Sequence, residues 1–359
     1  MSRPEHPEIA WFAALCDDDY ELLGVADPAL RSSWPHCRDI TLAAERNGYD
    51  NILLPSGYAL GIDSVAFAAA VAPLLDRLQL LVAVRCGELV VPQLARQLAT
   101  LDHLLGGRLT INIISSDVPG EALPSGPRYQ RTREHMQALR TLLDGRPLDL
   151  HGDFVDLAID PPRIAREVGA CPPLYFGGFS PDAKRTAAEQ ADVFLTWPDT
   201  VASVGDTVEE MTALSAEAGR ELRYGLRTHV IVRETEGAAM DAARHLVSQL
   251  DDQAGAEIRS RSLDAASAGV ARQSELRDVA DADGFVEDGL WTGIGRARSG
   301  AGAAIVGDPD QVRAKLEAYR GVGIDAFILS GYPHLAECER FARLVLDDLP
   351  HAPLHGAIS

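Results

Sequence analysis

The stretch LQLLVAVRCGELVVPQLARQLATLDHLLGGRLTINIIS, residues 78–115, contains the pattern that decides the fold. Two apolar runs rich in β-branched residues, 78–85 and 109–115, flank a segment from Pro92 to Leu105 with helical periodicity. Strands with continuous apolar runs are typical of parallel sheets that are buried on both faces. The stretch is therefore predicted to form a strand, a helix and a second, parallel strand.

The same alternation continues on both sides of this stretch. Strands are predicted at 8–15, 51–55, 78–85, 109–115, 174–176, 193–197, 222–233 and 326–330, and helices at 40–47, from 63, at 92–105 and at 128–143. About eight such units predict an α/β fold, a (β/α)8 TIM barrel with insertions, and a doubly wound open sheet is the competing architecture. No GxGxxG motif follows the first strand, which disfavours a dinucleotide-binding domain.

The domain organisation follows from length and from two irregular stretches. A chain of 359 residues with 46% hydrophobic residues can bury one large core, so residues 1–359 are predicted to form a single barrel domain. Residues 145–173 are rich in Pro and Asp and are interpreted as an insertion. Residues 251–301 are too long for an ordinary barrel connection and are predicted to form a mobile lid over the active site.

Charge and cysteine content exclude several classes of protein. Lys and Arg total 33 against 53 Asp and Glu, and the net charge of −20 disfavours a nucleic-acid partner. An anionic substrate would need local cations for the same reason. The five cysteines are scattered without ligand-like spacing, so no metal site is predicted. No apolar run approaches the ~18 residues of a membrane span, and a cytoplasmic location without membrane association is expected.

Two spaced pairs of polar residues stand at the ends of the last two predicted strands. In a barrel the chemistry lies at the carboxyl ends of the strands. Arg227 and His229 are two residues apart, so both are predicted to project into the barrel. A buried Arg needs an anion, which could be a substrate or a protein carboxylate. Tyr332 and His334 follow the eighth strand, where they could form part of the site or only a turn.

Other candidates are weaker when each is taken alone. Trp197 could line an apolar pocket or cap the core. Gly178 and Ser180 lie at a helix start whose free amides would suit a phosphate. Arg298, in the glycine-flanked part of the second insertion, could close on an anion or be an ordinary exposed arginine.

Together these residues give the chain a resemblance to a known family. It resembles the FMNH2-dependent alkanesulfonate monooxygenases of the bacterial-luciferase superfamily, nearly from end to end. The similarity is carried by ARQLATLDHLLGGR at 95–108, PPLYFGG at 172–178, AAEQADVFLTW at 187–197, RTHVIVRET at 227–235, SGAGAAIVGD at 299–308 and LSGYPHL at 329–335.

The resemblance implies a two-component system. A separate NAD(P)H-dependent flavin reductase would supply FMNH2, which reacts with O2 on this protein, and a small anionic organosulfonate would be converted to an aldehyde and sulfite. A homo-oligomer, dimer or tetramer, is also implied. The catalytic and substrate-binding residues carried over are Arg227, His229, Arg298, Tyr332 and His334, with Trp197 as a wall of the substrate pocket; FMN would lie near Asn112, Tyr129, Gly178 and Ser180.

Two departures from the family's pattern leave the substrate open. Cys16 stands where the family has a histidine, and the loop after Pro55 lacks the family's cysteine. The alternatives are therefore a luciferase-like flavin or deazaflavin oxidoreductase acting on a sulfone, a sulfonated sugar or a nitrogen compound. A non-catalytic flavin-binding relative is a further alternative.

Overall fold

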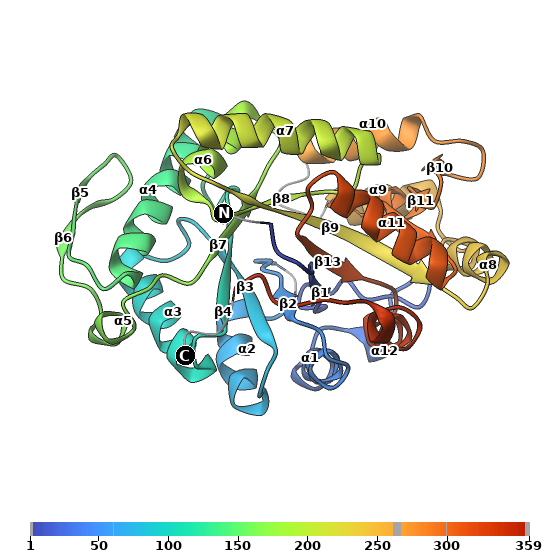
Figure 1. Cartoon of the computed structure of the whole chain (residues 1–359), viewed down its shortest axis with the longest axis horizontal. Helices are drawn as coiled ribbons and strands as arrows, with labels where there is room; N and C mark the ends of the chain where they lie inside the picture. Colours follow the sequence, from blue (N-terminus) through green and yellow to red (C-terminus); the bar gives the residue numbers. More distant parts are fainter. Residues whose placement is uncertain (1–2, 60, 261–266, 299, 356–359) are drawn as a thin grey trace.

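A closed barrel of eight parallel strands forms the centre of the protein (Figure 1). The computed structural model describes residues 3–59, 61–260, 267–298 and 300–355. The barrel strands are β1 (Glu8–Phe12), β2 (Asn51–Leu54), β3 (Gln79–Arg85), β4 (Leu109–Ile114), β7 (Leu174–Gly177), β8 (Val193–Thr196), β9 (Arg223–Val232) and β13 (Ala326–Ser330). Strand β13 joins β1 to β9, and β9 pairs in addition with β8 at the other end of the strand order, which closes the sheet and confirms the predicted (β/α)8 architecture over the open one.

Helices surround the barrel on its outside (Figure 1). They are α1 (Trp34–Arg46), α2 (Ser64–Val71), α3 (Val91–Leu105), α4 (Ser125–Leu143), α6 (Pro181–Gln190), α7 (Val201–Glu217), α8 (Glu236–Leu246), α11 (Pro309–Gly321) and α12 (His334–Leu344), with short 3-10 turns at η1 (Pro28–Leu30), η2 (Ala72–Leu74) and η4 (Leu346–Asp348). Capping residues set the ends of these helices. Ser180 caps α6 ahead of Pro181, and Gly106 ends α3 in the left-handed conformation. Within the described residues, no helix combines the length and apolar character needed to cross a bilayer.

The core has an outer and an inner part. Side chains that face outward from the strands pack against the helices in the largest apolar cluster. A smaller cluster fills the barrel interior and consists of Ala10, Phe12, Leu53, Leu81, Tyr175, Val193 and Ile328. Because small and large side chains fill the interior, the polar residues needed for chemistry are confined to the barrel's end.

The first predicted insertion contains regular structure that its composition did not indicate. Strands β5 (Leu148–His151) and β6 (Asp156–Ile159) form an antiparallel hairpin that projects beside α4, and helix α5 (Arg163–Val168) follows it (Figure 1). Each strand has only four residues, too few for a periodic pattern to stand out in the sequence.

The second predicted insertion folds into short elements that end on the barrel. It contains α9 (Asp252–Ser260), α10 (Ala268–Asp278), β10 (Phe285–Glu287), β11 (Leu290–Trp291) and η3 (Gly293–Arg296); residues 261–266 and 299 of the predicted lid lie outside the described residues. Strand β12 (Ala304–Gly307) then pairs in parallel with residues 229–232 of β9, beyond the half of β9 that pairs with β8. The insertion is therefore attached to the strand that carries Arg227 and His229.

Candidate active site

A cavity of about 430 Å³ opens at the carboxyl ends of the barrel strands. Its lining includes all the residues predicted to hold the flavin, together with two of the predicted substrate residues: Asn112, Tyr129, Gly178, Ser180, Trp197 and Arg227. Apolar side chains from four strands complete it: Leu53, Ile113, Leu195 and Ile328. Residues chosen from separate parts of the sequence thus share one concave site, as expected for a barrel mouth.

The five predicted catalytic residues form a group next to this cavity, which we call the polar cluster: Arg227, His229, Arg298, Tyr332 and His334. The ring of Tyr332 stacks on His229 at 5.2 Å and meets His334 edge-on at 5.1 Å. The guanidinium of Arg227 lies 4.3 Å from the centre of the Phe12 ring, and that of Arg298 lies 5.4 Å from it. Arg227 belongs both to the polar cluster and to the cavity lining.

Arg227 carries a positive charge that no carboxylate of the described residues pairs with directly. Its guanidinium is buried and donates to the backbone oxygen of Thr228 at 2.7 Å and to Oγ of Ser330 at 2.9 Å. Among the described residues it forms no ion pair with Asp or Glu, so the protein-carboxylate alternative is not what the structure contains. Burial, reinforced by Arg298, lowers the pKa of Arg227 to about 9. Such a group attracts an anion.

His229 lies beside this cation as a neutral imidazole. Its Nδ1 lies 2.8 Å from Oγ of Ser330, which also accepts from Arg227. The Ser330 hydroxyl can donate its hydrogen to Nδ1 or accept from it with its second lone pair, so either tautomer of His229 satisfies this contact. Burial and the neighbouring arginines lower the pKa of His229 well below its ordinary value. Nε2 is buried and finds no partner among the described residues.

Arg298 comes from the second insertion and reaches into the polar cluster rather than into solvent. One of its Nη1 hydrogen bonds goes to Oδ2 of Asp18 and another to the hydroxyl of Tyr332, both at 2.8 Å. Burial opposes its charge, but Tyr332 and Asp18 keep the pKa of Arg298 above its ordinary value. Oδ1 of Asp18 is buried and has no hydrogen-bond partner within the described part of the chain.

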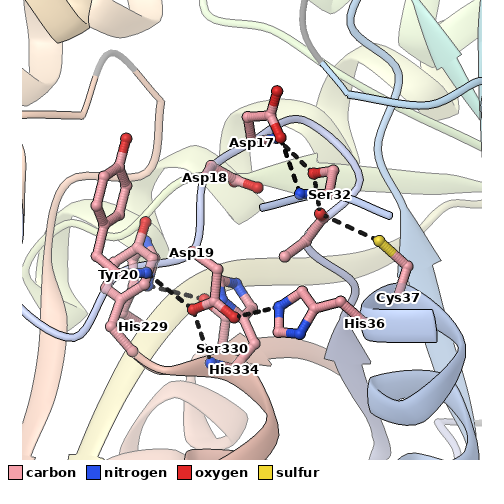
Figure 2. Close-up of polar contacts among 12 residues, drawn as sticks. Asp17, Asp18, Asp19, Tyr20, Ser32, His36, Cys37, His229, Ser330 and His334 are labelled. Atoms are coloured by element: carbon pink, nitrogen blue, oxygen red, sulfur yellow. Dashed lines mark hydrogen bonds and ion pairs between the residues drawn. The ribbon is translucent and has the colours of Figure 1, made fainter. Parts of the chain in front are cut away.

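His334 is held by residues that the sequence analysis did not select (Figure 2). It begins α12, and its Nδ1 lies 2.9 Å from Oδ1 of Asp19. The other oxygen of Asp19 lies 2.9 Å from Nε2 of His36. The sequence does contain a signal for Asp18 and Asp19, because this acidic run follows the first predicted strand. Polar residues at the carboxyl ends of the other strands are candidates for the same reason.

Trp197 connects the cavity to the second insertion. Its ring packs against Phe179 with centroids 6.0 Å apart. A Cβ placed on Gly269, in the first turn of α10, would lie 2.6 Å from Cζ3 of Trp197. Only glycine permits this approach, so the start of α10 closes the cavity directly over the indole.

The thiol of Cys16 lies in an environment that disfavours its thiolate. Burial raises the pKa of the Cys16 thiol, with a contribution from Asp18, so the sulfur stays protonated. Over the described ranges of the chain, no three His, Cys, Asp or Glu side chains are grouped to hold a metal ion.

Comparisons with known proteins agree with this architecture. The model of the family described as luciferase-like monooxygenase matches residues 19–326. A sulfoquinovose monooxygenase from Novosphingobium aromaticivorans is 60% identical over 97% of this chain and 98% of its own length. One from Agrobacterium fabrum is 50% identical over 96% and 91%. The crystal structure of riboflavin lyase, with modified FMN and riboflavin, superposes with a TM-score of 0.77 at 14% identity, covering 98% of this chain and 94% of that one. The chain therefore belongs to the luciferase-like monooxygenase family.

Proposed function

We propose that this chain uses reduced FMN and O2 to release sulfite from a sulfonated sugar, leaving an aldehyde. The observation that carries the proposal is the buried guanidinium of Arg227, which lines the cavity without a carboxylate partner among the described residues. The relatives that are 60% and 50% identical are named for sulfoquinovose, a sugar sulfonate. Arg227 suits the sulfonate group of either substrate class, and the names of the relatives favour a sulfonated sugar over the simple alkanesulfonate suggested by the sequence resemblance.

The polar cluster suits a sulfonate for a chemical reason. A sulfonate remains anionic at every physiological pH and offers three acceptor oxygens. Arg227 supplies charge-assisted hydrogen bonds, and Nε2 of the neutral His229 donates a further one when it carries the ring proton. In a chain of net charge −20, this local positive potential is what would attract and orient an anion.

Asp18 suits the hydroxyl groups of a sugar. Its Oδ1 is a buried carboxylate oxygen without a partner among the described residues, while Oδ2 is already paired with Arg298. An unsatisfied buried carboxylate oxygen costs free energy until a donor fills it. A sugar hydroxyl is such a donor, whereas the alkyl chain of an alkanesulfonate offers none.

The other side of the cavity fits FMN. A Cβ on Gly178 would lie 2.6 Å from Ala183 Cβ and 3.5 Å from the Tyr129 hydroxyl, so the backbone there forms a narrow cradle. The N-terminus of α6, capped by Ser180, supplies positive dipole for a phosphate, and Arg128 has a buried Nε without a partner in the described structure. Asn112 and the apolar lining suit the flavin ring. When bound, reduced FMN would supply the electrons that activate O2.

The chain's own residues then have distinct tasks. Arg227, His229 and Arg298 hold the sulfonate group, while Trp197 and the start of α10 exclude water from the cavity. Tyr332 and His334 are left to exchange protons with the substrate. A separate flavin reductase is proposed as the source of reduced FMN, and a homo-oligomer as the assembly.

The test is sulfite release measured with FMN, NADH and an added flavin reductase. Sulfoquinovose, ethanesulfonate and hexanesulfonate are compared at equal concentrations, and reactions without O2 or without reductase serve as controls. We expect the highest kcat/KM with sulfoquinovose and a loss of at least about 100-fold in the Arg227→Met variant. Equal or better turnover of the alkanesulfonates would contradict the sugar substrate, and no sulfite from any sulfonate would contradict the proposed reaction.

A further inference from the structure

Asp19 lies between two histidines, one deep in the polar cluster and one near the surface (Figure 2). Its carboxylate is fully buried. Oδ1 accepts from the backbone N–H of His334 and faces its Nδ1, both at 2.9 Å, and Oδ2 lies 2.9 Å from Nε2 of His36. The side chain of His36 is 10% exposed, so this chain of contacts runs from the site towards solvent.

Among the described residues, the two imidazoles face the carboxylate of Asp19, and no Lys or Arg forms an ion pair with it. Burial alone would raise its pKa, but the charge and hydrogen bonds of His334, together with His36, hold the pKa of Asp19 below its ordinary value. Asp19 is therefore a carboxylate, and a carboxylate accepts but does not donate. The hydrogen on the Asp19 side of the His334 ring must then belong to Nδ1.

This fixed orientation determines what the other ring nitrogen can do. Nε2 of His334 is buried and has no hydrogen-bond partner in the described part of the chain. In the neutral form of the ring, Nδ1 carries the proton and Nε2 is a free acceptor next to the ring of Tyr332.

We propose that Asp19 and His36 are positioning residues that make His334 the proton acceptor of the reaction. The proposal rests on the proposed function. When the oxygenated carbon carries both a hydroxyl and the sulfonate, the hydroxyl proton moves to Nε2 of His334. The O–H electron pair becomes the second bond of the aldehyde C=O, and the C–S electron pair leaves with sulfite. The new imidazolium lies against the Asp19 carboxylate, which stabilises it, and His36 keeps that carboxylate oriented.

Asp19 also has a structural contact, which the variants must separate from its effect on His334. Oδ1 also accepts the first backbone N–H of α12, as a helix cap does. Asn caps helices about as well as Asp, so Asp19→Asn keeps one oxygen for the cap, removes the charge and replaces the oxygen facing His36 with an NH2 group. Asp50 is the matched control at the other end of the barrel, since its Oδ2 accepts from the backbone of Ile9 and lies 2.9 Å from Nδ1 of His351.

The experiment follows sulfite release against pH for the wild type, Asp19→Asn and Asp50→Asn. Other titratable groups around Asp19 and His334 are His229, Tyr332 and Cys37, with Asp17 and Asp18 nearby, and all remain in these variants. We expect kcat of Asp19→Asn to fall about 100-fold, with KM within about twofold of the wild-type value. The part of the pH–rate profile that reports the titration of the general base is also expected to shift. Asp50→Asn is expected to follow the wild-type profile. An Asp19→Asn profile that matches the wild type would overturn the proposal.

His36 gives a graded test of the same idea. His36→Ala removes the hydrogen bond to Oδ2 of Asp19, and His36→Gln can restore an N–H donor there. We expect kcat to fall roughly tenfold in His36→Ala and to recover most of that loss in His36→Gln. Equal losses in the two variants would contradict the positioning role.

A spectroscopic readout separates this inference from the proposed function. The ¹⁵N spectra of histidine-labelled protein report which ring nitrogen carries the proton, without substrate or flavin, and His334→Asn assigns the signal. The proton of His334 is expected on Nδ1 in the wild type and to be redistributed in Asp19→Asn. A wild-type His334 protonated only on Nε2 would refute the inference even if sulfite is released. A wild type that releases no sulfite but shows the Nδ1 proton would refute the proposed function instead.

Discussion

Replacing Arg227 with Met should remove sulfonate binding without weakening the fold. The side chains have similar length, but Met has no charge. Burial lowers the pKa of Arg227 to about 9, well below its ordinary value. The charge on the buried side chain therefore destabilises the folded state by about 5 kcal/mol, at 1.36 kcal/mol per pKa unit. A base with a lowered pKa carries this penalty in full below pH 9 and loses it as the pH rises towards the ordinary pKa of arginine.

Favourable contacts of Arg227 offset most of that penalty. Its two hydrogen bonds to neutral oxygens contribute about 3 kcal/mol together, and its contact with the Phe12 ring about 1 kcal/mol. The net change for Arg227→Met is then about 1 kcal/mol of stabilisation at pH 7. The expected Tm is equal to that of the wild type or a few degrees higher.

Thermal unfolding with and without sulfoquinovose measures both effects. At 100 times its Kd, a ligand stabilises the wild type by about 2.7 kcal/mol, and Arg227→Met should lose this increment. Arg233→Met is the matched control, because Arg233 follows the same strand but pairs with the buried Glu337 at 3.0 Å. Arg233→Met should lower Tm because it removes one of the two arginines that pair with the buried Glu337, the other being Arg340, and it should keep the stabilisation by the ligand. A Tm drop of more than about 5 °C in Arg227→Met, or a retained ligand increment, would refute the reasoning.

Three further predictions concern other parts of the protein. Burial raises the pKa of Glu8 to about 7. The favourable contribution of protonated Glu8 to the stability of the fold is therefore complete below pH 4.5 and is lost as the pH rises through 7. Glu8→Gln should raise Tm at pH 8 but not at pH 4.5. Gly178→Val should weaken FMN binding by at least tenfold in a fluorescence titration, because even its Cβ would lie 2.6 Å from Ala183 Cβ, and an unchanged Kd would place the phosphate elsewhere. Asp18→Asn should raise KM for sulfoquinovose about tenfold while leaving KM for ethanesulfonate within about twofold, and parallel changes would show that Asp18 acts only through Arg298.

The barrel strands could be predicted from the sequence because most of them are short, mainly apolar runs. The missed strand β12 has only four residues and follows a glycine-rich stretch, so no periodicity marks it. The apolar pattern predicts the start of α1 at Ile40, six residues after its true start at Trp34, because the first turn of the helix lies mostly towards solvent. Its cap at Ser33 and the proline after Trp34 were the available signals.

Within the site, the sequence reveals residues whose own type is out of place. Arg227 and His229 interrupt an apolar strand with a spacing of two, and that period is a local property. Ser330 looks like any residue at a strand end, and its importance comes from the pairing of β13 with β9, which puts it opposite His229. His36 is likewise ordinary in its helix and meets Asp19 only in the folded chain. Contacts of this kind depend on register and packing, which one sequence does not encode locally.

The position of β12 has a consequence for the order of events during folding. His229 lies opposite Ala304 on one side and Ser330 on the other, so three distant segments of the chain meet in one row. Closing the long loops between them is slow compared with forming the local strand–helix units. This row should be completed late. In a refolding experiment, recovered helical signal would then precede recovered activity, and the delay would measure the time the chain needs to bring its second insertion onto the finished barrel.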